Sequence, residues 1–240
     1  IFQALSPQRH HLILDLNARS GLLTWEAVRQ VPEGGVFARV ADPQDFDALT
    51  EQATLLPELS RPHLFLGDLT AALDQWPELR FDGIVGRQGL GSDTVARLVE
   101  RLAEKGRIVV WEQVRSQRLY ALLDPARLSP DLLHALAQAE DALHTDLDIA
   151  QLTAEFSPDM AVNTEPVSLQ RDLPMTPALL ERWFAPNSTY LTHLQQHLTA
   201  SEVDTVQRQF VQQLSYQTVT WHTDACLIQA QWSNTKKAQH

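Results

Sequence analysis

The stretch that decides the fold is residues 11–24, which read HLILDLNARSGLLT. A short apolar run ends at Asp15, a turn containing Gly21 follows, and an amphipathic segment begins directly after that turn. A strand, a glycine-containing turn and a helix in this order are typical of a doubly wound α/β sheet, in which ligands bind beyond the carboxyl ends of the strands. The loop after Asp15 is therefore the first place to expect a ligand.

The same alternation continues through the first half of the chain. Further β-rich runs lie at 36–40, 63–66, 81–85 and 107–111, and amphipathic stretches lie at 22–30, 43–56, 69–76 and 92–105. Five strands that alternate with helices predict a parallel sheet covered on both faces and wound by right-handed crossovers. Lys105-Gly106 is expected to end the fourth helix, since glycine commonly follows the last helical residue.

The second half has a different pattern. Helices are predicted within 126–158 and at 176–184, 189–198 and 201–214, with a short strand at 160–169. Two alternating runs, Gln217–His222 and Cys226–Trp232, flank Thr223-Asp224-Ala225 and predict a hairpin. We therefore expect a Rossmann-like core at 1–125, a mostly helical insertion at 126–214, a C-terminal β-hairpin at 215–232 that completes the sheet, and a frayed tail at 233–240.

Composition excludes several classes of protein. Hydrophobic residues make up 44% of the chain and charged residues 20%, as in ordinary globular proteins. No apolar run approaches the roughly 18 residues that cross a bilayer, and no signal segment opens the chain, so we expect a cytoplasmic setting without membrane contact. The net charge of −11 argues against direct nucleic-acid binding through a broad basic face. The first residue, Ile1, predicts a fragment of a longer chain, whose partners are other domains of that chain or a separate protein.

The sequence predicts no metal site. Cys226 is the only cysteine, which excludes an internal disulfide and a cysteine-rich metal site, and we interpret it as a small buried strand residue. His193 and His197 lie four residues apart on a predicted helix, a spacing that can bind zinc. Because no third ligand is obvious, a solvated helix face is the favoured interpretation.

The loop after Asp15 resembles the first motif of class I S-adenosylmethionine-dependent methyltransferases, in which an acidic residue is followed by alternating glycines and a helix. Glycines there let backbone amides approach the cofactor closely. Other segments resemble the same family in the same order: Gly35–Asp45, Gly67-Asp68-Leu69, Phe81–Val85, Leu98–Val110 and the terminal hairpin. The resemblance covers about residues 8–120 and 215–232. It implies a doubly wound seven-stranded sheet whose last hairpin is antiparallel.

The same resemblance implies a cofactor site for S-adenosylmethionine. The implied binding residues are Asp15, Asn17, Arg19, Gly21, Asp42, Asp68 and Leu69. The family's glycines would fall at positions 17, 19 and 21, and only Gly21 is glycine. The ribose-binding acid would fall at Ala41, so Asp42 either replaces it after a one-residue shift or caps the next helix. Asp15 and Asp68 could equally stabilise helix N-termini.

The positions that would carry chemistry differ further from the family. After the fourth strand the chain reads Gly86-Arg87-Gln88-Gly89, without the Asn/Asp-Pro-Pro-aromatic motif that positions an amino group, and no cysteine nucleophile is available. No catalytic residue is predicted, although a methyltransferase can act by proximity alone. Arg19 and Arg87 follow neighbouring strands and could form an anion site. The favoured interpretation is that each is exposed or pairs with a nearby aspartate.

Two functions compete at this point. The first is a degenerate methyltransferase-like module that acts in interaction or regulation within a larger protein. The pattern of residues 179–184 and 217–221 also resembles the C-terminal domain fused to replication-associated recombination ATPases of the AAA+ class in cyanobacteria, which implies a role in DNA replication and recombination. ATP hydrolysis would lie elsewhere, because no Gly-Lys-Ser/Thr phosphate loop occurs here. The second function is an active methyltransferase on a small molecule or protein.

Overall fold

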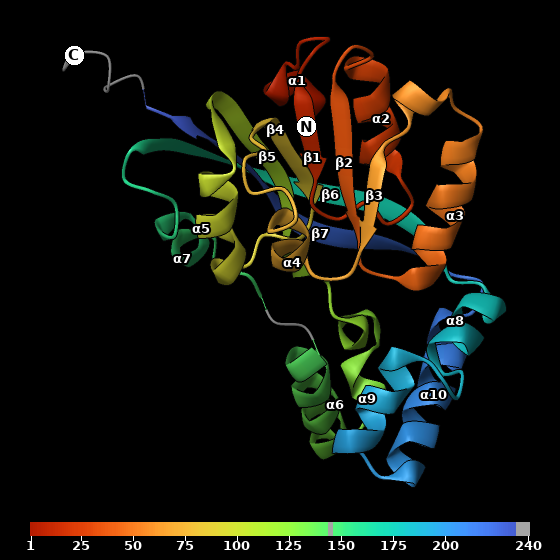
Figure 1. Cartoon of the computed structure of the whole chain (residues 1–240). Coiled ribbons are helices and arrows are strands. Elements are labelled where there is room, and N and C mark those ends of the chain that lie inside the picture. Colours follow the sequence, from red (N-terminus) through yellow and green to blue (C-terminus); the bar gives the residue numbers. More distant parts are fainter. Residues whose placement is uncertain (144–145, 234–240) are drawn as a thin grey trace. The chain divides into compact units, whose positions relative to one another are not determined.

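The computed structural model describes residues 1–143 and 146–233, so nearly all of the tail predicted at 233–240 lies outside the described residues (Figure 1). The strands are β1 (Leu12–Asp15), β2 (Gly35–Val40), β3 (His63–Leu66), β4 (Phe81–Arg87), β5 (Leu102–Ser116), β6 (Met160–Pro174) and β7 (Thr218–Trp232). The helices are α1 (Phe2–Leu5), α2 (Leu22–Gln30), α3 (Pro43–Thr54), α4 (Leu69–Leu73), α5 (Ser92–Glu100), α6 (Pro130–Leu143), α7 (Ile149–Ala154), α8 (Pro177–Trp183), α9 (Thr189–His197) and α10 (Ala200–Leu214). Three short 3₁₀ turns are η1 (Glu58–Ser60), η2 (Leu119–Leu122) and η3 (Pro125–Arg127).

The strands form one seven-stranded sheet in the order β3-β2-β1-β4-β5-β7-β6. The first five strands are parallel to one another, with β1 between β2 and β4. This arrangement confirms the predicted doubly wound Rossmann-like sheet. The order reverses at β1 and β4, the switch point at which such sheets bind ligands.

The last two strands of the chain, β6 and β7, form an antiparallel pair, as predicted. The residues that make up the pair differ from the prediction. Ser168 donates a side-chain hydrogen bond to Asp224 and Thr220 donates one to Asp172, so residue numbers fall along one strand as they rise along the other. The hairpin expected at Gln217–His222 and Cys226–Trp232 is instead one strand, β7, and its partner is β6. A two-residue hairpin turn of the favoured types needs positive φ, and residues 223–225 have none.

Helices pack on both faces of the parallel half of the sheet. On one face Ile13 and Val36 contact Ala27 of α2, and Ala38 and Val40 pack with Leu49 of α3. On the other face aromatic rings gather beside the end of α4, where Phe37 lies edge-on to Trp76 and Phe81. Burial of both faces explains why the sequence shows near-continuous apolar runs in these strands.

Gly106 does not end a helix, contrary to the expectation from Lys105-Gly106. Helix α5 ends at Glu100, and Gly106 lies inside β5. A Cβ atom at Gly106 would lie 2.8 Å from the carbonyl oxygen of Phe81, where the β4–β5 register shifts. The glycine therefore permits a close approach at a β-bulge.

The chain divides into two compact units. Unit 1 contains Ile1–Glu112, Asp148–Val167 and Ala225–His240, and unit 2 contains Gln113–Leu147 and Ser168–Asp224. The dividing points fall within β5, β6 and β7 and just before α7. Unit 2 has its own apolar core, in which Leu136, Met175, Leu194, Val206 and Phe210 are fully buried. Among the described helices, none has the length and apolar character needed to cross a membrane.

Candidate functional site

Asp15 lies at the end of β1 and organises the loop that follows. Its side chain is completely buried, its Oδ2 accepts a hydrogen bond from Thr24 Oγ1 (2.8 Å), and its Oδ1 accepts one from the Asn17 amide (3.2 Å). Burial raises the pKa of Asp15 to about 6, against the opposing effect of these hydrogen bonds. The buried Asp15 carboxylate therefore ties both ends of the loop together beneath the surface.

The loop keeps the backbone shape that glycines would give it. Arg19 has φ 43° and Gly21 has φ 80°, both in the left-handed region that ordinary side chains avoid. The Gly21 amide bonds to the Ala18 carbonyl (2.6 Å), and the Ala18 amide bonds to the Arg39 carbonyl on β2 (2.9 Å). At position 19 the chain thus has a backbone conformation that glycine adopts easily, although the residue is an arginine.

Gly21 is buried under side chains. A Cβ atom there would overlap Trp25 Nε1 and Leu49 Cδ2. Trp25 Nε1 is buried and, within the described residues, has no hydrogen-bond partner. The side chains of Trp25 and Leu49 therefore cover the place that a side chain at position 21 would occupy.

An open pocket of about 520 Å³ lies over the carboxyl ends of β1 and β2, within unit 1. Its volume falls in the range of small-molecule sites. The lining residues are mostly polar: Asn17, Arg19, Arg39, Ala41, Asp42, Gln44 and Asp45. The structure thus brings three predicted residues, Asn17, Arg19 and Asp42, to one pocket. Arg39 and Gln44 were not predicted.

Asp42 and Asp68 both cap helices. Asp42 Oδ1 accepts hydrogen bonds from the Gln44 and Asp45 amides at the start of α3 (2.7 and 3.3 Å). Asp68 Oδ1 accepts from the Ala71 amide at the start of α4 (2.9 Å), and Leu69 is buried. Asp68 and Leu69 do not line the pocket. Asp42 lines the pocket and also caps α3.

The loop after β4 adjoins the loop after β1. Asn17 Nδ2 donates to the Arg87 carbonyl (3.4 Å), while the Arg87 guanidinium lies over the Trp111 ring at 5.4 Å. Arg87 is not among the pocket residues, so the alternative of a joint Arg19–Arg87 anion site does not apply to this pocket. Arg19 and Arg87 are both exposed, and neither has an ion pair within residues 1–143 and 146–233.

Glu112, which sequence reasoning missed, fixes the β4–α5 loop. Its carboxylate, buried within β5, accepts a hydrogen bond from the Leu90 amide (2.8 Å). Desolvation raises the pKa of Glu112, and the backbone hydrogen bonds from Leu90 and Gly89 act against that rise. An acidic residue directly after an otherwise apolar run was the signal available in the sequence.

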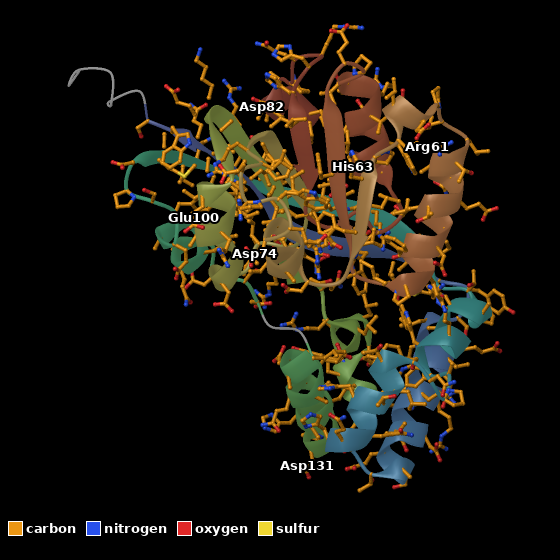
Figure 2. The ribbon with its side chains drawn as sticks, in the orientation of Figure 1. Arg61, His63, Asp74, Asp82, Glu100 and Asp131 are labelled. Carbon is orange, nitrogen blue, oxygen red and sulfur yellow. The ribbon has the colours of Figure 1, made fainter. Side chains whose placement is uncertain are left out.

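Other ionisable groups lie away from the pocket. Asp82, labelled in Figure 2, sits near the start of β4 and accepts a hydrogen bond from the Leu12 amide (2.8 Å) at the amino end of the sheet. In unit 2 the rings of His193 and His197 lie 4.8 Å apart, and His193 Nε2 bonds to the Ala139 carbonyl (3.0 Å). Across the described ranges, no three His, Cys, Asp or Glu side chains are grouped to hold a metal.

The buried Asp15 carboxyl predicts a pH-dependent stability of unit 1. Because its folded pKa of about 6 exceeds the ordinary value of 3.8, folding takes up a proton between these values, and stability falls as pH rises from about 4 to about 6. The loss is about 1 kcal/mol per pH unit at its steepest. We expect Asp15→Asn to flatten this part of the profile in urea titrations at pH 4 and pH 6.5. An unchanged difference between the two pH values would contradict the prediction.

The sheet order, the antiparallel last pair and the loop after β1 define the Rossmann-like fold of class I S-adenosylmethionine-dependent methyltransferases. The YcgJ protein of Bacillus subtilis shares this fold with 15% identity over 97% of both chains and a TM-score of 0.60. A Bacillus halodurans C-125 protein with a suggested methyltransferase activity matches with 11% identity over 95% of both chains and a TM-score of 0.55.

A third structure carries a ligand. It is the S-adenosylmethionine-dependent methyltransferase of Geobacter sulfurreducens in complex with S-adenosyl-L-homocysteine, with 14% identity, coverage of 95% of this chain and 87% of that chain, and a TM-score of 0.51. At these identities the likeness is one of fold. No protein-family model matches the sequence, and no curated protein matches it.

Proposed function

We propose that this chain is a degenerate methyltransferase-like module that acts in interaction or regulation and does not transfer methyl groups. The observation that carries the proposal is Arg19, which holds a glycine-like backbone conformation and lines the pocket with its side chain. A sulfonium cofactor is positively charged, so an arginine at this place opposes it. The burial of Gly21 under Trp25 adds a steric obstacle.

The residues of the pocket therefore fit S-adenosylmethionine poorly. Asp42 and Asn17 offer oxygens and an amide for ribose hydroxyls, but Arg19 and Arg39 add two positive charges. Within the described loop after β4, no side chain supplies a recognisable base or nucleophile. We derive no methyl-transfer step through this site.

An active methyltransferase on a small molecule or protein is the second candidate. The volume of the pocket, about 520 Å³, and the position of Asp42 beside the end of β2 favour it. Rearrangement of the exposed Arg19 side chain would then have to accompany binding.

The further expectation of a parent AAA+ ATPase in replication and recombination stays a prediction that no comparison supports. Such a parent would supply the domains with which this module interacts. That expectation does not bear on the chemistry of the pocket.

Calorimetry with S-adenosylmethionine and S-adenosyl-L-homocysteine separates the two candidates. We expect no binding by the unaltered chain at millimolar ligand and measurable binding by Arg19→Gly. Glycine relieves the strain of the left-handed backbone at position 19, but it also increases the conformational entropy of the unfolded chain. These effects oppose each other, so the free energy of unfolding of this variant should stay within about 1 kcal/mol of that of the unaltered chain. Arg80→Gln, an exposed change at the amino end of β4, serves as the control.

Micromolar binding by the unaltered chain, weakened by Asp42→Ala, would refute the degenerate function and support the enzyme. Ligand at 100 times its dissociation constant should then stabilise the fold by roughly 2.7 kcal/mol, which thermal unfolding would detect.

A further inference from the structure

The pocket holds two arginines with unused hydrogen-bond donors. Arg39 Nε donates to the Gly67 carbonyl (2.8 Å), which fixes the side chain and leaves its two terminal nitrogens without a partner in the described residues. Arg19 is exposed and has no hydrogen bond or ion pair there either. A guanidinium presents a planar fork of donors that matches the oxygens of a phosphate or carboxylate.

The other polar residues of the lining offer hydrogen-bond acceptors. Asp42 uses Oδ1 to cap α3, and no hydrogen bond is found for its Oδ2 in the described chain. Asn17, Gln44 and Asp45 line the same pocket. A ligand that suits this lining carries an anionic group for the arginines and hydroxyl groups for the carboxylate and amide side chains.

The position of the pocket narrows the class of ligand. In doubly wound sheets that bind dinucleotides, an acid near the end of the second strand holds a ribose hydroxyl, or an arginine near that place accommodates a phosphate on the ribose. Here the strand β2 is followed by Ala41, and Arg39 on β2 reaches the pocket from the same strand end. Asp42 comes one residue later and lines the pocket as well.

We propose that this pocket binds a phosphorylated nucleoside, whose phosphate is held by Arg19 and Arg39 and whose free ribose hydroxyl faces Asp42. This inference rests on the proposed function. The nucleotide would bind where a methyltransferase binds its methyl donor, and it would act there as a regulatory ligand. The two arginines attract a phosphate and repel a sulfonium. The two aspartates of the same lining, Asp42 and Asp45, are left to accept hydrogen bonds from hydroxyl groups.

Calorimetry at low salt tests the proposal with adenosine 2′-monophosphate, adenosine 5′-monophosphate, adenosine and inorganic phosphate as probes. We expect at least one monophosphate to bind about tenfold or more tightly than adenosine and than phosphate alone. Arg19→Gln should weaken that monophosphate by about tenfold, because it removes a charged donor from an exposed side chain that supports no part of the fold. Arg80→Gln should leave the affinity unchanged.

Arg39→Gln should weaken the same ligand, with circular dichroism and thermal unfolding checking that the loss of the Gly67 contact leaves unit 1 folded. The absence of binding by either monophosphate, equal binding of adenosine, or full affinity in Arg19→Gln would overturn the proposal. Phosphate alone binding as tightly as the nucleotides would overturn its nucleoside part. Methyl transfer from S-adenosylmethionine would refute the proposed function independently of these results.

Discussion

Replacement of Gly21 by alanine is expected to destabilise unit 1 by about 2–5 kcal/mol. Gly21 has φ 80°, and an alanine in the left-handed region costs about 1–2 kcal/mol. The added methyl group would also overlap Trp25 and Leu49, which pack over this position, and overpacking of such a site costs about 1–3 kcal/mol. Urea titration monitored by circular dichroism measures the loss.

Two other glycines separate the contributions. Gly67 has φ 104°, but a Cβ atom at this position would have no neighbouring atom within 4 Å, so Gly67→Ala should show the backbone strain alone, about 1–2 kcal/mol. Gly91 has φ −116°, and a Cβ atom there would make only an ordinary contact with Thr94 Oγ1 at 3.9 Å, so Gly91→Ala should change stability by less than about 0.5 kcal/mol. Equal losses for Gly21→Ala and Gly67→Ala would show that the packing of Trp25 over the loop adds nothing.

Glu140 is expected to make the stability of unit 2 depend on pH. It is fully buried on α6, and its Oε1 accepts hydrogen bonds from Tyr190 Oη (2.6 Å) and the Tyr120 amide (3.0 Å). Its Oε2 is buried without a partner in the described residues. Desolvation raises the pKa of Glu140 to about 7, although these hydrogen bonds favour the ionised form.

Since the folded pKa of Glu140 lies above its ordinary value of 4.5, folding binds a proton between pH 4.5 and about 7. Stability is then greatest below that interval and falls as pH rises through it, by roughly 3 kcal/mol in total. Glu140→Gln keeps an acceptor for Tyr190 and cannot ionise. We expect it to be less stable than, or equal to, the unaltered chain at pH 5 and more stable at pH 8, as measured by urea titration.

Two further variants check the cause. Tyr190→Phe removes a donor that favours the ionised carboxylate, so the loss of stability between pH 5 and pH 8 should become steeper. Glu181→Gln, on the exposed face of α8, should leave the pH profile unchanged. A parallel profile for Glu140→Gln and the unaltered chain would exclude Glu140 as the titrating group.

Most of the fold was predictable from local patterns. Strands β1, β2 and β4 are buried along most of their length, and the apolar runs of the first five strands alternate with amphipathic helices, so the existence of these strands could be predicted without tertiary information. The last strands were harder. β7 alternates between exposed and buried positions, and Thr223-Asp224-Ala225 has the composition of a turn. The strand continues through this segment because it pairs with β6, as the hydrogen bonds of Ser168 with Asp224 and of Thr220 with Asp172 show.

The site could likewise be predicted only where it depends on local sequence. The loop between Asp15 and Gly21 is contiguous, so its motif is visible in the sequence, and Asp42 follows a recognisable strand. Arg39 could not be found in this way, because its place in the pocket depends on the β1–β2 register and on the Gly67 carbonyl. The burial of Gly21 under Trp25 and Leu49 likewise depends on how α2 and α3 pack, which periodicity does not specify.

The position of β7 in the sheet also determines when the sheet can be completed during synthesis. β7 is the last strand of the described chain, yet it lies between β5 and β6, both of which leave the ribosome earlier. Until residue 232 has been made, these two 15-residue strands have no common neighbour, and their facing edges are open to other chains. During synthesis the chain therefore passes through a stage in which β5 and β6 are complete but β7, the strand that pairs with both, has not been made. We expect the protein to depend on chaperones most strongly at that stage.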